Sequence, residues 1–367
     1  MTDSQMEQDF PIYYVIMAGG RGTRFWPRSR TRKPKQLLDI IGPQTMLEQT
    51  IDRILPLSDW DHIVVVTEIS QAEAIRKLLP RLKESHLLIE PLGKNTAPCI
   101  GLAALIVFQW DPKASMAILP ADHFISKMED FQKTLQTALE VSRKGDFLIT
   151  LGIKPVVPET GYGYLEQGKK IMEQRGAAVW EVKAFHEKPD QDRAKVMLQT
   201  GTFFWNSGMF IWSVSTVLKK MSQWTPDLYR ELMALEKVYR RPGWDQALRQ
   251  AYERMENISI DYALMERSDQ VVMLQADFGW NDVGSWEAVY QLEGKDGEGN
   301  CFKGSVLALD SQGCLVDSPD KTVTLIGVQD LVIVTTPDAV LICPRSRSQD
   351  VKKIVELLEK KGREDLL

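Results

Sequence analysis

The chain has 367 residues, a hydrophobic content of 44% and a formal net charge of −5, which together describe a globular protein with room for one large and one smaller domain. Its acidic balance argues against a general nucleic-acid or membrane-surface binder, so we expect neither kind of partner. The polar N-terminus predicts no signal peptide, and four scattered cysteines without a CxxC pair favour reduced thiols and a cytoplasmic location. The apolar run 99–110 is too short to span a bilayer and predicts a buried helix.

Strands and helices alternate through the first part of the chain. Predicted strands cover 13–20, 62–67, 86–91, 115–123 and 147–153, and predicted helices cover 45–55, 71–82, 99–110 and 131–145. This alternation predicts βαβ units and an α/β domain built on a mostly parallel sheet. Ligands of such sheets bind at the carboxyl ends of the strands, where Gly20 and Asp122 both fall.

The remaining residues are predicted to complete this domain and to form a smaller one. Strands are expected at 177–189, 203–212 and 270–277, and helices at 214–223, 245–255 and 259–266. The glycine-rich stretch 295–300 is a candidate boundary, which divides the chain into a polar extension (1–11), a large domain (12–293) and a small domain (294–367). Evenly spaced strand-like pieces at 304–311, 313–319, 321–328, 330–337 and 339–344 predict a small β-helix-like module, closed by a helix over 348–362.

One stretch, Ala18–Gln36, gathers seven basic residues around three glycines and contains no acid. It is not a Walker A motif, and Phe25 stands where a dinucleotide fingerprint needs a small residue. Glycines let backbone N–H groups close around phosphate oxygens, and Arg21, Arg24 and Lys35 suit a triphosphate. A plain turn is the competing interpretation of the glycines. A solvated basic loop is the interpretation that we prefer for the three other arginines, Arg28, Arg30 and Arg32.

Two carboxylates stand in turn-like sequences, Asp122 in LPADH and Asp282 in FGWNDVGSW. Each one alone is best explained as turn chemistry, because Asp favours turns. Beside a phosphate loop they become candidate Mg²⁺ ligands, since magnesium takes one or two protein carboxylates and completes its shell with phosphate oxygens and water. His123 needs no role as a base, because a phosphomonoester, with a second pKa of about 6, is already mostly deprotonated at neutral pH.

Six motifs, in order from about Val15 to Trp286, resemble those of the sugar-phosphate nucleotidyltransferases. They are AGGRGTRFWPRSRTRKPKQ, LPADH, GYGYLE, FHEKPD, FWNSGMFIW and FGWNDVGSW. The resemblance implies a Rossmann-like α/β nucleotidyltransferase domain followed by a small β-helix-like domain. Some members of the family add an isomerase domain of the cupin type, which we do not expect here because the chain stops at Leu367 after a helical tail.

The resemblance also implies a reaction. Within the family the motifs are most similar to those of enzymes that join GTP to α-D-mannose 1-phosphate, giving GDP-mannose and pyrophosphate by Mg²⁺-assisted in-line attack on the α-phosphate. A related enzyme with another nucleotide or sugar is one alternative. A non-catalytic regulatory paralogue that binds sugar nucleotides is another, although such a chain would be expected to lose the loop arginines or the metal carboxylates. The apolar C-terminal module further suggests a homodimer.

The site residues follow from matching motif to motif. The resemblance places Ala18, Gly19, Gly20, Arg21 and Asp122 at the nucleotide, and Gly163, Glu187, Lys188, Asn206 and Asp282 at the sugar phosphate. It gives catalytic roles to Arg24, Lys35 and Lys188. It makes Asp122 and Asp282 the metal ligands.

Three of these positions keep a second interpretation. Lys188 could stand in an ordinary exposed turn, and Asn206 could bond the backbone rather than a sugar hydroxyl, because a polar amide in an apolar strand must be satisfied. Glu90 follows a strand at the sheet's carboxyl edge, so its carboxylate could accept from the N1–H and N2–H₂ groups of guanine, with Asn95 and Thr96 nearby. An equally weighted alternative makes Glu90 a solvated or helix-capping acid.

Overall fold

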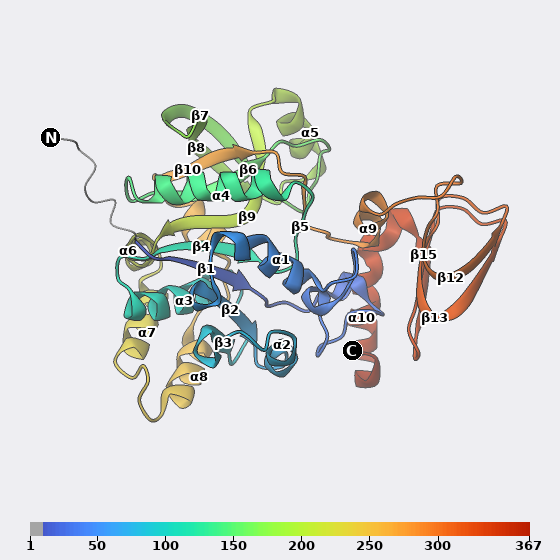
Figure 1. Ribbon diagram of the computed structural model, residues 1–367, viewed down its shortest axis with the longest axis horizontal. Helices are drawn as coiled ribbons and strands as arrows, with labels where there is room; N and C mark the ends of the chain where they lie inside the picture. Colours follow the sequence, from blue (N-terminus) through green and yellow to red (C-terminus); the bar gives the residue numbers. More distant parts are fainter. Residues whose placement is uncertain (1–9) are drawn as a thin grey trace.

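The computed structural model describes residues 10–367, so nearly all of the predicted extension 1–11 lies outside the described residues. Figure 1 shows a large α/β domain beside a smaller β-rich module. The large domain contains a nine-stranded sheet with the order β3-β2-β1-β4-β9-β6-β10-β8-β7. Its strands are β1 (Ile12–Met17), β2 (Ile63–Glu68), β3 (Leu87–Glu90), β4 (Ser115–Pro120), β6 (Leu148–Ile153), β7 (Gly163–Gln174), β8 (Ala177–Glu187), β9 (Phe203–Ser213) and β10 (Val271–Ala276).

The parallel part of the sheet is the part predicted from the alternation of strands and helices. Strand β1 pairs in parallel with both β2 and β4, in a register that sets Met17 beside Val66 and Pro120. The chain therefore leaves β1 in one direction and returns on its other side, which opens a crevice at the carboxyl ends of β1 and β4. Beyond β4, antiparallel pairings of β9, β8 and β7 complete the sheet around a parallel β6–β10 pair.

Helices cover both faces of this sheet (Figure 1). Alternate residues of β1 divide between the two faces, with Tyr14 and Ile16 in one core and Tyr13 and Val15 in the other. The first core packs on α1 (Met46–Ile54), α2 (Ala72–Leu78), α4 (Met128–Ser142) and α5 (Gln191–Thr200). The second packs on α3 (Thr96–Trp110), α6 (Val214–Trp224), α7 (Pro226–Glu236) and α8 (Trp244–Arg254). None of the helices in the described residues has the length and apolar composition needed to cross a bilayer.

Local sequence signals account for several helix boundaries. Thr45 caps α1 in a reciprocal capping box with Glu48, as the predicted N-cap requires. The predicted helix 71–82 is shorter than expected, because Pro80 cannot continue it and α2 ends at Leu78. The expected helix 259–266 is a π-helical turn, Asp261–Met265. Strand β7, helices α5, α7 and α9 (Trp286–Leu292), and the two-residue strands β5 (Phe124–Ile125) and β11 (Trp280–Asn281) have no counterpart among the predicted elements.

The C-terminal module is a short stack of β-helical coils. It comprises β12 (Cys301–Leu309), β13 (Leu315–Ile326), β14 (Leu331–Thr335) and β15 (Val340–Pro344), followed by α10 (Val351–Lys360). Cys301 stands beside Leu315, which stands beside Val332, so successive coils pair in parallel. The predicted pieces 313–319 and 321–328 form the single strand β13, because its pairing with β12 continues through both. Gly304 allows the close contact between the coils, since a Cβ there would lie 2.0 Å from the carbonyl oxygen of Ser318.

A third core joins this module to the basic loop of the large domain. Phe25 and Trp26 pack in one cluster with Trp286 of α9 (Trp286–Leu292) and with Val332 and Val355 of the module. The loop's aromatic residues are therefore buried by tertiary contacts with the C-terminal part of the chain.

Ion pairs strengthen the same junction. Arg28 donates from Nη1 to both carboxylate oxygens of Asp317, at 2.7 and 3.0 Å, and from Nη2 to Asp39 at 2.6 Å. Arg30 donates to Asp338 at 3.0 Å. The interpretation of Arg28 and Arg30 as a solvated part of the loop is therefore wrong, because both hold the small module against the large domain.

Candidate active site

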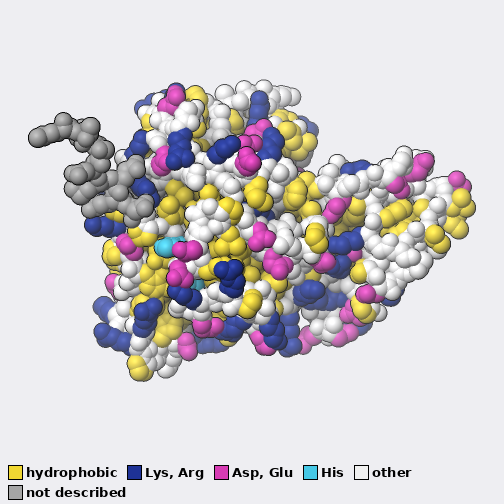
Figure 2. Space-filling view, in the orientation of Figure 1, with side chains coloured by type: hydrophobic (Ala, Val, Ile, Leu, Met, Phe, Trp, Pro, Cys, Tyr) yellow, Lys and Arg dark blue, Asp and Glu magenta, His cyan; other side chains and the backbone are white. Residues whose placement is uncertain are grey.

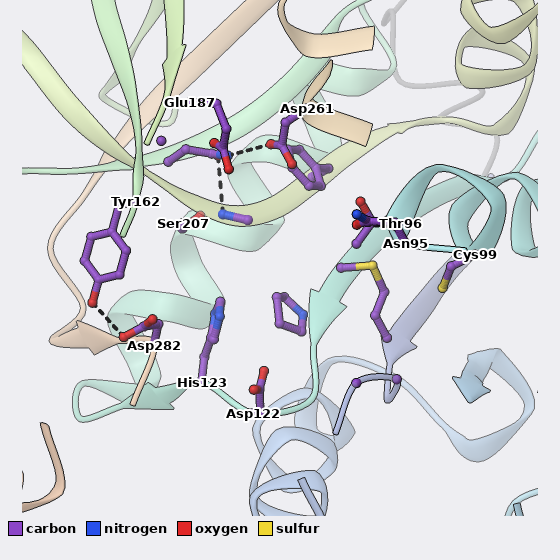
Figure 3. A pocket seen from close by; sticks show the side chains of 18 of the residues that line it. Asn95, Thr96, Cys99, Asp122, His123, Tyr162, Glu187, Ser207, Asp261 and Asp282 are labelled. Carbon is purple, nitrogen blue, oxygen red and sulfur yellow. Dashed lines mark hydrogen bonds between the residues drawn. The ribbon is translucent and has the colours of Figure 1, made fainter. Parts of the chain in front are cut away.

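A cavity of about 540 Å³ opens at the carboxyl ends of β1 and β4 (Figure 3). Ten of the residues predicted from the sequence line it: Gly19, Gly20, Glu90, Asn95, Thr96, Asp122, Gly163, Glu187, Asn206 and Asp282. A second cavity of about 220 Å³ adjoins it, since Asp122, His123 and Asp282 line both. Arg24 and Lys35 line only the second. The fold thus brings together residues that lie far apart in the sequence.

The glycines of the basic loop have separate structural reasons. At Gly20 a Cβ would have no neighbour within 4 Å, so space does not require glycine there. Its φ of +91° does, because residues with a side chain rarely adopt that backbone conformation. At Gly22, with a φ of +58°, a Cβ would lie 2.5 Å from the Cβ of Lys35. Gly22 therefore allows the helical turn that begins at Lys35 to pack directly against the glycine loop. Ala18 is buried below the loop, and its carbonyl accepts from Gln36 and Thr67.

The three cations predicted to meet a triphosphate stand in different surroundings. Arg24 is exposed at the smaller cavity and pairs with no acid among residues 10–367. Arg21 is also exposed, but its Nη1 lies 2.7 Å from Oε1 of Glu359 in α10. Lys35 is buried, and its Nζ lies 2.9 Å from Oδ2 of Asp122 and 2.6 Å from the carbonyl oxygen of Asp282. Arg24 is thus the cation most available to a ligand.

Asp122 and Asp282 line the same two cavities because two short strands pair. Strand β5 (Phe124–Ile125) pairs antiparallel with β11 (Trp280–Asn281), which sets the residue after β11 beside the residues before β5. Tyr162 donates to Oδ1 of Asp282 at 2.6 Å. Desolvation alone would raise the pKa of Asp122, but the charge and hydrogen bonds around the carboxylate, those of the Lys35 ammonium foremost, outweigh it and leave that pKa lowered. Asp122 is therefore held in the ionised form that a cation would need.

The donor set suits a hard divalent cation. No side chain among residues 10–367 donates to Oδ1 of Asp122 or to Oδ2 of Asp282, so one oxygen of each carboxylate is open to a cation. No third acid, histidine or cysteine in this part of the chain completes a metal cluster with them. Two carboxylates beside room for a polyphosphate fit magnesium, which takes its remaining ligands from phosphate and water.

His123 lies between the two carboxylates and is held as a neutral ring. The indole Nε1 of Trp280 donates to its Nδ1 at 3.1 Å, so the ring proton sits on Nε2. Desolvation by the surrounding protein lowers its pKa to about 4. A ring that is already neutral and accepts at Nδ1 supplies a donor rather than a charge.

Glu90 is buried at the end of the cavity formed by β3 and α3. Tyr252 donates to its Oε1 at 3.2 Å, and burial raises its pKa to about 8. The alternative of a solvated acid is therefore wrong. Asn95, with a φ of 68°, caps α3 through its own side chain, and Thr96 opens that helix. That Glu90 accepts from guanine stays a prediction, and it requires the donors of the bound base to favour the ionised carboxylate over the protonated form that burial favours.

The opposite end of the cavity is built on paired strands β7 and β8. Gly163 stands beside Glu187 in the register, and a Cβ at Gly163 would lie 2.7 Å from Oε2 of Glu187. The glycine of GYGYLE therefore allows the Glu187 carboxylate to approach the strand. Lys188 has a φ of 48° and an exposed side chain whose Nζ lies 2.7 Å from Glu187. It is not among the residues that line the cavity, and its proposed phosphate contact stays a prediction.

Asn206 lines this end of the cavity together with Glu187 and Asp261. Its Oδ1 accepts from Thr150 at 2.7 Å and from the backbone N–H of Gly208 at 3.3 Å. Its Nδ2 donates to Oδ1 of Asp261 at 2.9 Å. The amide is thus largely satisfied within the protein, so it positions its neighbours and keeps one N–H for a ligand.

Several residues that line the cavity were not predicted from the sequence. They are Glu68, Tyr162, Ser207, Asn257, Asp261 and Trp280. Tyr162 and Trp280 stand inside motifs already singled out, so their proximity was the available signal. Asp261 lies in a segment with an ordinary helical pattern, SIDYALME, and only the fold brings it to the cavity.

Comparison with protein families agrees with this geometry. A family model described as "Nucleotidyl transferase" matches residues 13–298, and one described as "MannoseP isomerase/GMP-like beta-helix domain" matches residues 304–358. The chain is 38% identical over 353 residues to the mannose-1-phosphate guanylyltransferase of Escherichia coli, which is 95% of this chain and 74% of that protein. It is 36% identical over 360 residues to the alginate biosynthesis protein AlgA of Pseudomonas aeruginosa, covering 96% of this chain and 73% of that one.

One solved structure shares nearly the whole architecture and another shares part of it. A Thermus thermophilus structure described as mannose-1-phosphate geranyltransferase superposes with a TM-score of 0.86 and 31% identity, covering 95% of this chain and 100% of that chain. A Helicobacter pylori structure described as mannose-6-phosphate isomerase gives a TM-score of 0.60 at 22% identity over 74% of this chain, and at that identity shows a shared fold alone.

Proposed function

This chain belongs to the nucleotidyl transferase family, and on that premise we propose that it is a mannose-1-phosphate guanylyltransferase, which condenses GTP with α-D-mannose 1-phosphate into GDP-mannose and pyrophosphate. The observation that carries the proposal is the shared cavity. The two adjoining cavities bring together four groups: a buried acid to bind the nucleobase, a glycine–arginine loop to bind phosphates, two carboxylates to bind a metal ion, and a polar end to bind a sugar. Relatives that carry this activity in their names align along nearly all of the chain.

The physical problem of this reaction is the meeting of two anions. Two unit charges about 4 Å apart repel by about 4 kcal/mol at an effective dielectric constant near 20, and the substrates bring several such pairs. Arg24, exposed at the smaller cavity, offsets this repulsion and stabilises charge on the leaving pyrophosphate. Lys35 neutralises Asp122 and holds the Asp282 carbonyl, so it fixes the two carboxylates in place and stands close to the phosphates.

The nucleophile is an oxygen of the sugar phosphate, so no side chain has to remove a proton. With a second pKa of about 6, the phosphate monoester is mostly dianionic at neutral pH. The protein's task is in-line placement of this oxygen behind the α-phosphate. Gly163, Glu187 and Lys188 would hold the sugar phosphate from one side of the cavity. Gly19, Gly20 and Arg21 would hold the nucleotide from the other, with Arg21 exchanging Glu359 for phosphate.

We propose Asp122 and Asp282 as the ligands of Mg²⁺. When bound, the ion would neutralise phosphate charge and polarise the reacting phosphorus. The coarser expectation for the family is a divalent metal, and the two open carboxylate oxygens support it.

The test is a substrate panel scored by pyrophosphate release. GTP, ATP, UTP and dTTP are each combined with mannose 1-phosphate and glucose 1-phosphate, with and without Mg²⁺. We expect GTP with mannose 1-phosphate to give the highest kcat/KM and to need the metal. A better pair elsewhere in the panel would assign a different substrate, and no turnover with any pair would indicate the non-catalytic paralogue.

Two further expectations accompany this function, a cytoplasmic location and a homodimer. Exposed apolar side chains gather on the β-helical module, as Figure 2 shows at the right of its view. They are Leu307, Leu309, Ile326, Val340 and Ile342. Light scattering of the purified protein would measure its molar mass and so test self-association. If a Leu309→Arg variant has the same molar mass as a dimeric parent, this apolar face is not the dimer interface.

A further inference from the structure

The carboxylate of Asp261 reaches the cavity with one oxygen that no other side chain of the described residues binds. Its Oδ1 accepts from Nδ2 of Asn206 at 2.9 Å, no other side chain of the described residues donates to the carboxylate, and the backbone N–H of Asp261 itself lies near enough to lower the pKa of the group. Asp261 is one of the residues that line the cavity (Figure 3). A ligand that fills the cavity would bury this oxygen, and buried polar atoms are normally hydrogen-bonded. The ligand should therefore offer it a hydrogen-bond donor.

The protein holds this side chain firmly in place. Asp261 opens a π-helical turn, and the residues before it are tied to the start of α3. The backbone N–H of Ile260 donates to Oγ1 of Thr96 at 2.8 Å, and the N–H of Ala97 donates to the carbonyl of Ile258 at 3.1 Å. On the other side, Asn206 is itself fixed by Thr150. Anchoring from both directions gives the orientation that a specific contact needs.

We propose that Asp261 binds a hydroxyl group of the hexose and thereby determines sugar specificity. This rests on the proposed function, because it names a residue of the same site. Asn206 joins Asp261 to the sugar end of the cavity, and Glu187 lines that end with it. Two neighbouring carboxylates present several acceptor oxygens, which suits the donors of vicinal hydroxyls.

The charges at this end favour a neutral polyol part over a phosphate. Burial and the neighbouring charge of Glu187 raise the pKa of Asp261 to about 7. Two acids so placed would repel a phosphate group, and Lys188, the cation paired with Glu187, is exposed and does not line the cavity. A carboxyl with a pKa near neutrality can accept from a hydroxyl or donate to one. The sugar's hydroxyl face therefore matches this wall better than its phosphate does.

The test compares Asp261→Asn and Asp261→Ala with a matched control, Glu266→Gln. Glu266 ends the same π-helical turn and also lies near Glu187, but it is exposed and does not line the cavity. We expect both Asp261 variants to raise the KM for mannose 1-phosphate by roughly 10- to 100-fold, the range for a hydrogen bond to a charged group, and to leave the KM for GTP within about twofold. Glu266→Gln should change neither constant.

Monodeoxy sugar phosphates separate direct contact from a structural effect. The wild-type protein should use at least one of the 2-, 3- or 4-deoxy analogues of mannose 1-phosphate far less well than the parent sugar. Asp261→Ala should use that analogue and the parent sugar about equally, because the partner of the missing hydroxyl is gone. If every analogue loses the same factor in the wild type and in Asp261→Ala, the contact does not exist.

The ribose of the nucleotide is the other source of hydroxyl groups. Kinetics with 2′-deoxy-GTP and 3′-deoxy-GTP test it, and a loss of discrimination confined to these nucleotides would overturn the assignment to the hexose. Failure of the proposed function looks different, because the wild-type protein would then prefer another pair in the substrate panel. If the wild-type protein is active on mannose 1-phosphate and the Asp261 variants have unaltered kinetic constants, this inference is refuted and the proposed function stands.

Discussion

The ion pair between Arg28 and Asp317 predicts how strongly the β-helical module is docked on the loop. The two side chains are only 12% and 4% exposed, and the guanidinium reaches both carboxylate oxygens. Burial raises the pKa of Asp317 despite the presence of Arg28, so its charge is tolerated only with a partner. Arg28→Met keeps most of the apolar stem but leaves that charge unpaired.

Breaking a buried pair by removing one partner costs about 3–5 kcal/mol, and we expect a loss in that range for Arg28→Met. Asp39 also loses its contact, but it is 40% exposed and adds little. The double variant Arg28→Met/Asp317→Leu should recover much of the loss, because apolar replacement of both partners strands no charge. Arg32→Met is the control, since Arg32 is exposed in the same loop and pairs with no acid in residues 10–367.

The assay is urea unfolding followed by circular dichroism, with the double-mutant cycle read from transition midpoints. Because the loop also carries Arg24, kcat/KM for GTP should fall in Arg28→Met and recover in the double variant Arg28→Met/Asp317→Leu. If Arg28→Met costs less than about 1 kcal/mol, and no more than Arg32→Met, the pair behaves like a surface salt bridge and the reasoning is refuted.

Three further predictions concern the site itself. Arg24→Ala should lower kcat by about 10²- to 10³-fold with little change in the urea midpoint. Steady-state kinetics of Arg32→Ala serve as the control, and an equal loss of kcat in that variant would show that the effect is not specific to Arg24. Asp282→Asn keeps the acceptor for Tyr162 but should weaken the dependence of activity on magnesium. The control is Asp277→Asn, since Asp277 is exposed, pairs with Lys127 and lines neither cavity; identical magnesium titration curves for the two variants would exclude the metal role. Glu90→Gln should narrow the preference for GTP over ATP. The pKa of Glu90 is raised from 4.5 to about 8, so between those values the folded state keeps a proton that the unfolded state has lost, and stability falls by about 1.4 kcal/mol per pH unit as the pH rises. The urea midpoint of Glu90→Gln should therefore rise relative to that of the wild type as the pH increases from 5.5 to 8.5. If the difference between the two midpoints does not change with pH, burial does not raise the pKa of Glu90.

The sequence by itself determined the features that local patterns encode. Alternating apolar runs and amphipathic segments predicted the parallel β1–β4 region, and Thr45 marked the start of α1. Glycines after an apolar strand located the loop, and the placement of Asp122 after β4 followed from the same rule. These predictions succeed because strand and helix periodicity, capping and turn preferences act over a few residues.

The tertiary structure alone decided what lies opposite each of these residues. The pairing of β5 with β11 sets Asp282 beside Asp122, and Tyr252 of α8 covers Glu90. Asp282 was predicted through the motif FGWNDVGSW but not its place in space, and Tyr252 cannot be recognised from its own neighbours in the sequence. The same holds for Asp317, which turns a loop arginine from a solvated charge into a buried tie, and for Asp261 at the sugar end of the cavity. The reason is physical: burial, pKa and ion pairing depend on which distant side chains exclude water from a group, and chain-local patterns carry no information about that.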